Sequence, residues 1–212
     1  MFKTIKFDAS AELVEKKSKF IANIFYVESV EEAEEKIKEV NKKYFDARHN
    51  CYAFSIYTDN GIVSRFSDNG EPSGTAGGPM LNILQGLGLS NCLVIVTRYF
   101  GGILLGTGGL VRAYSDATKM AIESTEIINK DLGIEASFTI SYSDLQKLQY
   151  YFNKNDIKIL DTKYNENIEV KFEITKEKYE NILEQDEKMN LNFNILDKEI
   201  LRNKYIEIDI EK

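Results

Sequence analysis

The chain has 212 residues, of which 43% are apolar and 29% are charged, so it can bury an ordinary core in one large domain or two small ones. Two cysteines without a pairing pattern argue against a disulfide-stabilised secreted protein. Residues 1–20 hold no apolar leader, and no run approaches the roughly 18 apolar residues of a membrane span. We therefore expect a cytoplasmic protein that does not contact membranes.

The net charge of −7 is unevenly distributed. Residues 1–130 hold 15 Lys and Arg against 16 Asp and Glu, whereas residues 131–212 hold 12 against 18. Neutralisation of phosphates supplies most of the affinity for nucleic acid, so the acidic second part is not expected to coat RNA or DNA. The first part can present a local arginine patch.

The first 45 residues predict a hairpin followed by a helix. Residues 3–15 and 18–27 alternate between apolar and polar side chains, which is typical of two strands. Ser29-Val-Glu-Glu32 has the pattern of a capping box, in which Ser29 caps the helix and Glu32 reaches back. Apolar residues follow at helical spacing, so a helix over 29–43 has one apolar face.

The middle of the chain predicts a second hairpin and two helices. Strands are expected over 51–57 and 62–66, with a turn at Asn60-Gly61. A loop over 67–79, a helix over 80–89 and a strand over 92–97 follow. The strand is apolar throughout, which indicates burial on both faces. A glycine-rich turn over 101–109 then leads into a helix over 109–125.

After residue 129 the pattern changes. Residues 134–142, 168–174 and 206–210 alternate strictly, and residues 157–164 supply a further strand. Helical patterns lie near 145–152, opened by the box Ser143-Asp-Leu-Gln146, and near 179–183. The order β-α-β-β-α-β is that of a ferredoxin-like split βαβ unit. We therefore predict an α+β protein with domains of residues 1–129 and 130–212.

The unusual residues are concentrated between residues 44 and 115. This stretch holds 12 of the 13 glycines, both prolines, both cysteines and the single histidine, and all of its cations are arginines. Glycine permits close backbone approach, and arginine suits carboxylate or phosphate groups. The composition indicates a recognition surface on a folded core.

Two glycine-rich loops are candidates for binding. In the loop 67–79, Ser73, Gly74, Thr75 and the glycines that follow Thr75 could place backbone amides at a helix start and attract an anion. Asp68 and Glu71 could instead act as acid and base, hold Mg²⁺, or simply form turns. The loop 101–109 joins a strand to a helix, as a phosphate-binding loop does, but matches no nucleotide motif. Its glycines could equally serve tight packing.

His49-Asn-Cys51 suggests a nucleophile and base, or two metal ligands, on one face of a strand. A structural pair is the alternative. With one histidine and two cysteines in the chain, a zinc site rich in Cys and His is excluded. We expect no metal and no cofactor.

Three motifs carry a family resemblance: Ala-Arg-His-Asn-Cys-Tyr-Ala at 47–53, Ser-Asp-Asn-Gly-Glu-Pro-Ser-Gly-Thr-Ala-Gly-Gly-Pro at 67–79, and the segment from Thr97 to Ser115. Together they resemble the YigZ/Impact family. This sequence differs from the family pattern at Gly78, where the family usually has Arg or Lys, and at Asn69, where Asp is common.

The resemblance implies a front domain of the ribosomal-protein-S5-domain-2-like fold and a back domain similar to domain V of elongation factor G, which is ferredoxin-like. It also implies a role in translation, because eukaryotic Impact proteins regulate translation through protein partners. A proline-dipeptidase activity, attached to some relatives, does not suit a chain with so few metal ligands.

Three hypotheses follow. The first is a cytosolic, non-enzymatic protein of translation control that contacts RNA, the ribosome or a protein partner through its Gly/Arg-rich face. The second is an enzyme acting on a small phosphorylated or acyl substrate with Cys51 and His49 or Asp68 and Glu71. The third is an oligomerising scaffold. The first assigns binding to two cations and two aromatic rings, two glycine-rich loops and the histidine: Arg98, Arg112, Tyr99, Phe100, Gly101, Gly102, Gly106, Thr107, Gly108, Gly109, Asp68, Glu71, Ser73, Gly74, Thr75 and His49.

Overall fold

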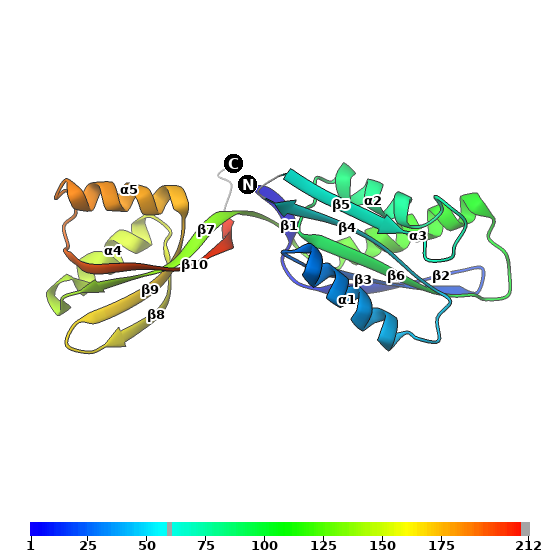
Figure 1. The fold of residues 1–212 in the computed structure, drawn as a ribbon, viewed down its shortest axis with the longest axis horizontal. Helices are drawn as coiled ribbons and strands as arrows, with labels where there is room; N and C mark the ends of the chain where they lie inside the picture. Colours follow the sequence, from blue (N-terminus) through cyan, green and yellow to red (C-terminus); the bar gives the residue numbers. More distant parts are fainter. Residues whose placement is uncertain (59–60, 209–212) are drawn as a thin grey trace. The chain divides into compact units, whose positions relative to one another are not determined.

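The computed structural model describes residues 1–58 and 61–208 and has a two-domain α+β fold (Figure 1). One compact unit comprises residues 2–129; the other comprises residues 130–212 together with Met1. Each unit has its own hydrophobic core.

The N-terminal unit is built on a five-stranded antiparallel sheet in the order β2-β3-β6-β4-β5. The strands are β2 (Ala9–Glu15), β3 (Ser18–Tyr26), β4 (His49–Thr58), β5 (Gly61–Ser67) and β6 (Cys92–Tyr99). Helices α2 (Gly77–Gly86) and α3 (Thr107–Glu123) pack on one face, and α1 (Val30–Lys43) packs on the other (Figure 1).

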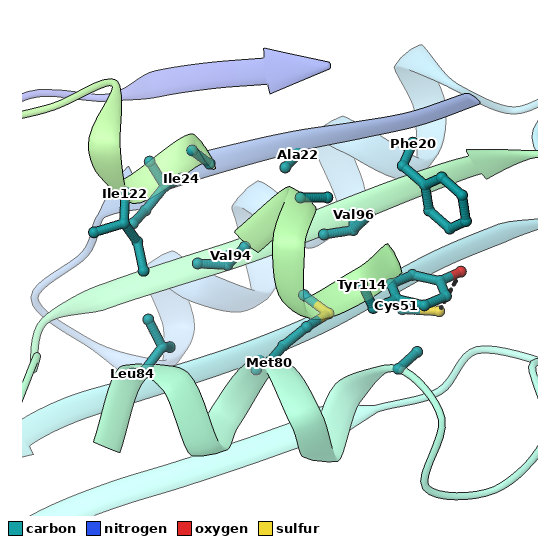
Figure 2. Close-up of a cluster of buried hydrophobic side chains, with 14 of the residues drawn as sticks. Phe20, Ala22, Ile24, Cys51, Met80, Leu84, Val94, Val96, Tyr114 and Ile122 are labelled. Carbon is teal, nitrogen blue, oxygen red and sulfur yellow. Dashed lines mark hydrogen bonds between the residues drawn. The ribbon is translucent and has the colours of Figure 1, made fainter. Parts of the chain in front are cut away.

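The central strand β6 is buried on both faces, which confirms the prediction from its apolar run. Val94 and Val96 belong to the core under α2 and α3, with Met80 and Tyr114 (Figure 2). The alternate residues of β6 belong to the core under α1. Successive side chains of a strand point to opposite faces of the sheet. A strand that is buried on both faces must therefore be apolar at odd and at even positions.

Three helix starts differ in detail from the prediction. The hydroxyl of Ser29 accepts from the Glu32 amide at 3.0 Å as predicted, but Glu32 accepts from the Glu28 amide at 2.8 Å rather than from the cap residue. Helix α2 begins at Gly77 rather than residue 80, and α3 begins at Thr107 rather than residue 109. The glycines that suggested a loop form the first turns of both helices.

The predicted strand 3–15 is two strands. β1 (Phe2–Ile5) pairs with β7 (Ile127–Ile140), and only β2 forms the hairpin with β3. After β1 the Lys6 amide donates to the Glu126 carbonyl at 2.8 Å, and the Asp8 carboxylate accepts from the Tyr26 amide at 2.9 Å. The predicted hairpin of β4 and β5 is confirmed, although Asn60 of its turn lies outside the described residues.

The C-terminal unit has the predicted element order. After β7 come the 3₁₀ turn η1 (Tyr142–Asp144), α4 (Leu145–Lys154), β8 (Lys158–Tyr164), β9 (Ile168–Thr175), α5 (Lys176–Glu187) and β10 (Ile195–Ile208). The strands lie in the order β10-β7-β9-β8. Apolar residues on one face of the sheet pack against α4 and α5, whereas the other face carries charged side chains.

Two predictions for this unit are wrong. The box at Ser143 does not form; Ser141 instead donates to the Asp144 carboxylate at 3.0 Å, and η1 precedes α4. β10 begins at Ile195, well before the predicted residue 206, because its first half is mostly exposed and lacks the alternation that marks a half-buried strand. Ile210, at the end of the predicted strand, lies outside the described residues.

Candidate functional site

The three motifs meet at one end of the N-terminal sheet. The strand registers pair Glu15 with Ser18 and His49 with Arg98, so β2 and β6 end where β3 and β4 begin. The connections at this end are residues 16–17, 44–48, 68–76 and 100–106. Together with the start of α3, residues 107–112, we call them the loop end. Helices α2 and α3 both begin here, and α1 ends here.

Arg98 points inward and forms a buried ion pair with Glu71. The Nη1 of Arg98 donates to the Glu71 carboxylate at 2.7 Å, and the two side chains are 7% and 3% exposed. The guanidinium carbon lies 5.5 Å from the ring centroid of Phe20 and 5.6 Å from that of Phe100. Arg98 was predicted to contact a partner, but in the structure its guanidinium is held by an internal carboxylate and is not exposed.

Tyr114 and Cys51 extend this network into the core. The Tyr114 hydroxyl donates to the same Glu71 carboxylate at 2.9 Å. The Cys51 sulfur lies 2.9 Å from the Asp68 carbonyl oxygen and 3.4 Å from the Tyr114 hydroxyl (Figure 2). Burial raises the pKa of the Cys51 thiol to about 12, so the thiol stays protonated near neutral pH.

Asp68 occupies the amides that were predicted to bind an anion. Its carboxylate accepts from the backbone amides of Gly74, Ala76 and Gly77 at 2.8–2.9 Å. An added Cβ at Gly77 would lie 2.8 Å from the backbone of Ser67, so the start of α2 packs directly on the end of β5. The anion at this helix start belongs to the chain itself.

The remaining residues of this loop have structural partners or face solvent. Thr75 is buried, and its hydroxyl donates to the Pro72 carbonyl at 2.6 Å. Nδ1 of His49 lies 2.9 Å from the Asn69 carbonyl oxygen, which can only accept, so Nδ1 carries the proton. Ser73 and Gly74 are exposed.

The second glycine-rich loop combines one packing glycine with an exposed surface. A Cβ at Gly101 would lie 1.9 Å from the Lys17 carbonyl carbon, so the loop crosses the β2–β3 turn in contact with its backbone. The Tyr99 hydroxyl donates to Asp46 at 2.7 Å. Phe100 is 47% exposed, and Leu104 is 83% exposed. Gly102 is also exposed.

The start of α3 is open to solvent. Gly106 is its N-cap, without a side-chain hydrogen bond, and Thr107 and Gly108 are exposed. Arg112, one turn later, is exposed, and its only hydrogen bond within the described chain is a 3.4 Å contact to the Gly108 carbonyl. Beside it lies a hollow of about 240 Å³ lined by Leu13, Glu15, Lys16, Leu105, Gly109, Arg112, Ala113 and Asp116.

The loop end therefore uses its carboxylates internally and exposes its cations. Lys16, Lys17, Arg48 and Arg112 are exposed and form no ion pair with any residue that the structure describes. Arg112 was among the predicted site residues, whereas Lys16, Lys17 and Arg48 were not. Arg48 lies in the motif 47–53. The available signal was a pair of lysines in the two-residue turn between alternating strands.

Neither a metal-binding cluster nor a membrane-spanning helix is found in residues 1–58 and 61–208. They contain no group of three or more His, Cys, Asp or Glu side chains that could hold a metal ion. No helix among them has the length and apolar character needed to cross a membrane.

Each unit contains a match to a known protein-family domain. The Impact N-terminal domain model matches residues 16–122, and a domain of unknown function, DUF1949, matches residues 138–185. The chain is 36% identical over 166 residues to IMPACT family member YvyE of Bacillus subtilis, covering 78% of this chain and 76% of that one. It is 38% identical over 150 residues to YigZ of Escherichia coli, covering 70% and 74%.

A solved structure is similar to this one over nearly the whole chain. A crystal structure described as that of a hypothetical protein has a TM-score of 0.63 and 28% identity, and the match covers 99% of this chain and 98% of the other. The match to the Impact N-terminal domain and the identity to the two IMPACT family members establish that the chain belongs to the IMPACT family.

Proposed function

We propose that this chain is a cytosolic, non-enzymatic protein of translation control that contacts ribosomal RNA through the loop end. The observation that carries the proposal is the set of four exposed cations without ion pairs, Lys16, Lys17, Arg48 and Arg112. Family membership supports a role in translation, as the resemblance to the Impact proteins implied.

The charge pattern suits a polyanion. Phosphate binding depends on cations that are free to release counterions, and the carboxylates Asp68 and Glu71 are already bonded inside the fold. The exposed ring of Phe100 offers a stacking surface for an unpaired base beside these cations. The ion pair of Arg98 with Glu71 ties the first glycine-rich loop to strand β6 below this surface.

Two finer fold assignments belong with this proposal. The strand order β10-β7-β9-β8 with both helices on one face supports a ferredoxin-like C-terminal domain. We assign the N-terminal unit to the S5-domain-2-like fold on the strength of the family motifs, with the domain boundary near residue 130. The ferredoxin-like assignment corresponds to domain V of elongation factor G, named above, which is consistent with a ribosomal ligand.

Catalysis by Cys51 or by the loop carboxylates is not part of the proposal. The thiol is protonated and buried, Glu71 is neutralised by Arg98, and Asp68 caps α2. A nucleophile or a general base needs a free and accessible group. Cys51 and the Glu71 side chain are buried, and three backbone amides already occupy the Asp68 carboxylate.

The test is co-sedimentation with purified ribosomes and with ribosomal RNA across a salt series. The double variant Arg48→Ala/Arg112→Ala should bind more weakly, with a log–log salt slope shallower by about 1.4–1.8, because two phosphate contacts are removed. Arg65→Ala is the matched control, since Arg65 is exposed but paired with Glu34 at 3.2 Å. Absence of binding by the wild type at low salt, or an equal effect of the control, would refute the RNA contact.

A further inference from the structure

β2 lies at the open edge of the N-terminal sheet. It pairs with β3 over seven consecutive residues, from Ala9 with Ile24 to Glu15 with Ser18, and no strand of the described chain pairs with its other side. An open edge of this length presents a row of amides and carbonyls to which another extended chain can add.

The turn after β2 fixes which groups face that edge. Lys16 and Lys17 have φ values of 45° and 64°, as in a two-residue type I′ turn. In such a hairpin the flanking residues form a hydrogen-bonded pair, here Glu15 with Ser18. The pattern alternates along the ladder, so Ser10, Glu12 and Val14 direct their backbone N–H and C=O groups to the open edge.

The 240 Å³ hollow lies beside this edge, on the side of α3. Leu13 and Glu15 line it from one face of β2, and Gly109, Arg112 and Ala113 line it from one face of α3. A strand added to β2 would place every second side chain on this same face of the sheet. The hollow exceeds the about 150 Å³ that accommodates a benzene-sized group, so it has room for one aliphatic side chain.

The charges around the hollow favour an acidic occupant. Lys16 and Arg112 have no ion pair within the described chain, whereas Asp116 lies 3.7 Å from Lys119. The charged side chains that line the hollow are two cations and two carboxylates, the second carboxylate being Glu15; Lys119, which neighbours Asp116 outside the hollow, brings the net charge of the five side chains to +1. The first turn of α3 adds a partial positive charge and holds no acidic residue.

We propose that β2 and the hollow bind an extended segment of a protein partner. That segment adds to the sheet as a strand, inserts an aliphatic side chain between Leu13 and Ala113, and brings an acidic side chain, two residues away on the same face, to Lys16 and Arg112. A second copy of the chain fits less well. Two-fold pairing of β2 with itself about its central residue would set Glu12 against Glu12.

The experiment is selection of random nonapeptides displayed on phage against the immobilised full chain, without RNA. Selected peptides should carry an aliphatic and an acidic residue at positions i and i+2. Binding of a fluorescein-labelled selected peptide is then measured by anisotropy. Val14→Pro, which removes one outward amide, and Arg112→Glu, which reverses an exposed charge, should each weaken binding about tenfold.

Val14→Thr is the matched control, because it keeps the amide and should bind like the wild type. Arg112 is exposed, so Arg112→Glu should fold even if Val14→Pro does not, and it keeps the test decisive. Three results would overturn the proposal: no peptide selected, equal binding to the wild type and both variants, or a concentration-dependent dimer in sedimentation that Val14→Pro abolishes. The last result would assign the edge to a second copy. Val14 is not among the four cations proposed to bind RNA, and the peptide assay contains no RNA. The peptide proposal and the RNA proposal can therefore fail separately.

Discussion

Charged residues are used in opposite ways by the loop end of the N-terminal unit and by the open sheet face of the C-terminal unit. On the sheet face the carboxylates hold cations: Arg202 donates to Glu135 at 2.9 and 2.7 Å, and Glu173 binds both Lys158 and Lys204. At the loop end the carboxylates are bonded internally, and Lys16 and Arg112 remain unpaired within the described chain.

The difference shows that net charge alone does not locate an anion-binding surface. Residues 1–130 are almost neutral overall, yet one end of their sheet exposes four cations. A cation that is already paired must lose its partner before it can bind a phosphate, whereas an exposed unpaired cation needs only to release its counterion.

The largest expected effect comes from breaking the buried pair under the loop end. Glu71→Ala leaves Arg98 charged and buried without its carboxylate and also removes the acceptor of Tyr114. We expect unfolding in urea to show a loss of about 3–5 kcal/mol. Glu34→Ala, which frees the exposed Arg65, should cost at most about 1 kcal/mol. Equal losses of unfolding free energy in the two variants would contradict the distinction between the buried ion pair and the exposed one.

The second largest effect is expected where a glycine lies directly against another backbone segment, in contrast to a glycine with open space beside it. Gly101→Ala forces a Cβ into the Lys17 backbone and should destabilise the protein by about 1–3 kcal/mol in thermal or urea unfolding. Gly108→Ala meets no atom within 4 Å in the first turn of α3, so it should stabilise by about 0.5–1 kcal/mol. A loss of stability in Gly108→Ala would contradict the open space at this position.

A smaller effect concerns the pH dependence of the sheet face. Burial of Glu173 opposes its ionisation, but hydrogen bonds from Lys204 and Lys158 outweigh burial and lower the pKa of this carboxyl. Because the folded pKa lies below the unfolded value, the contribution is complete above about pH 4.5 and is lost as the pH falls through the folded pKa.

Glu173→Gln tests this dependence. It should destabilise the chain by about 1 kcal/mol at pH 7 and by less at pH 3, measured by urea unfolding at both values. A loss that is the same at pH 3 and pH 7 would assign the effect to packing instead of the ion pairs.

The smallest expected effect is on thiol chemistry. Burial raises the pKa of both Cys51 and Cys92 to about 12, so iodoacetamide at pH 8 should leave both thiols unmodified in the folded protein and label both in urea. Selective labelling of Cys51 in the folded protein, read by mass spectrometry, would reopen the catalytic hypothesis.

The sequence alone determined the elements and the family. Alternation and helical spacing predicted nearly every strand and helix because these patterns report directly which face is buried. The motifs at 47–53, 67–79 and 97–115 identified the family that the comparisons then established. Exposed segments without a pattern, such as the first half of β10, were not predicted.

Only the tertiary structure decided what the motif residues do. Arg98 lies on a strand that is buried on both faces, so its position in the sequence does not tell which side it faces or which carboxylate it meets. Asp68 caps α2 because a chain reversal brings amides six to nine residues ahead back to its carboxylate. Lys16 joins Arg112 across the β2–α3 hollow, 96 positions apart in the chain. Local sequence patterns carry no information on such contacts, because they depend on how distant segments pack.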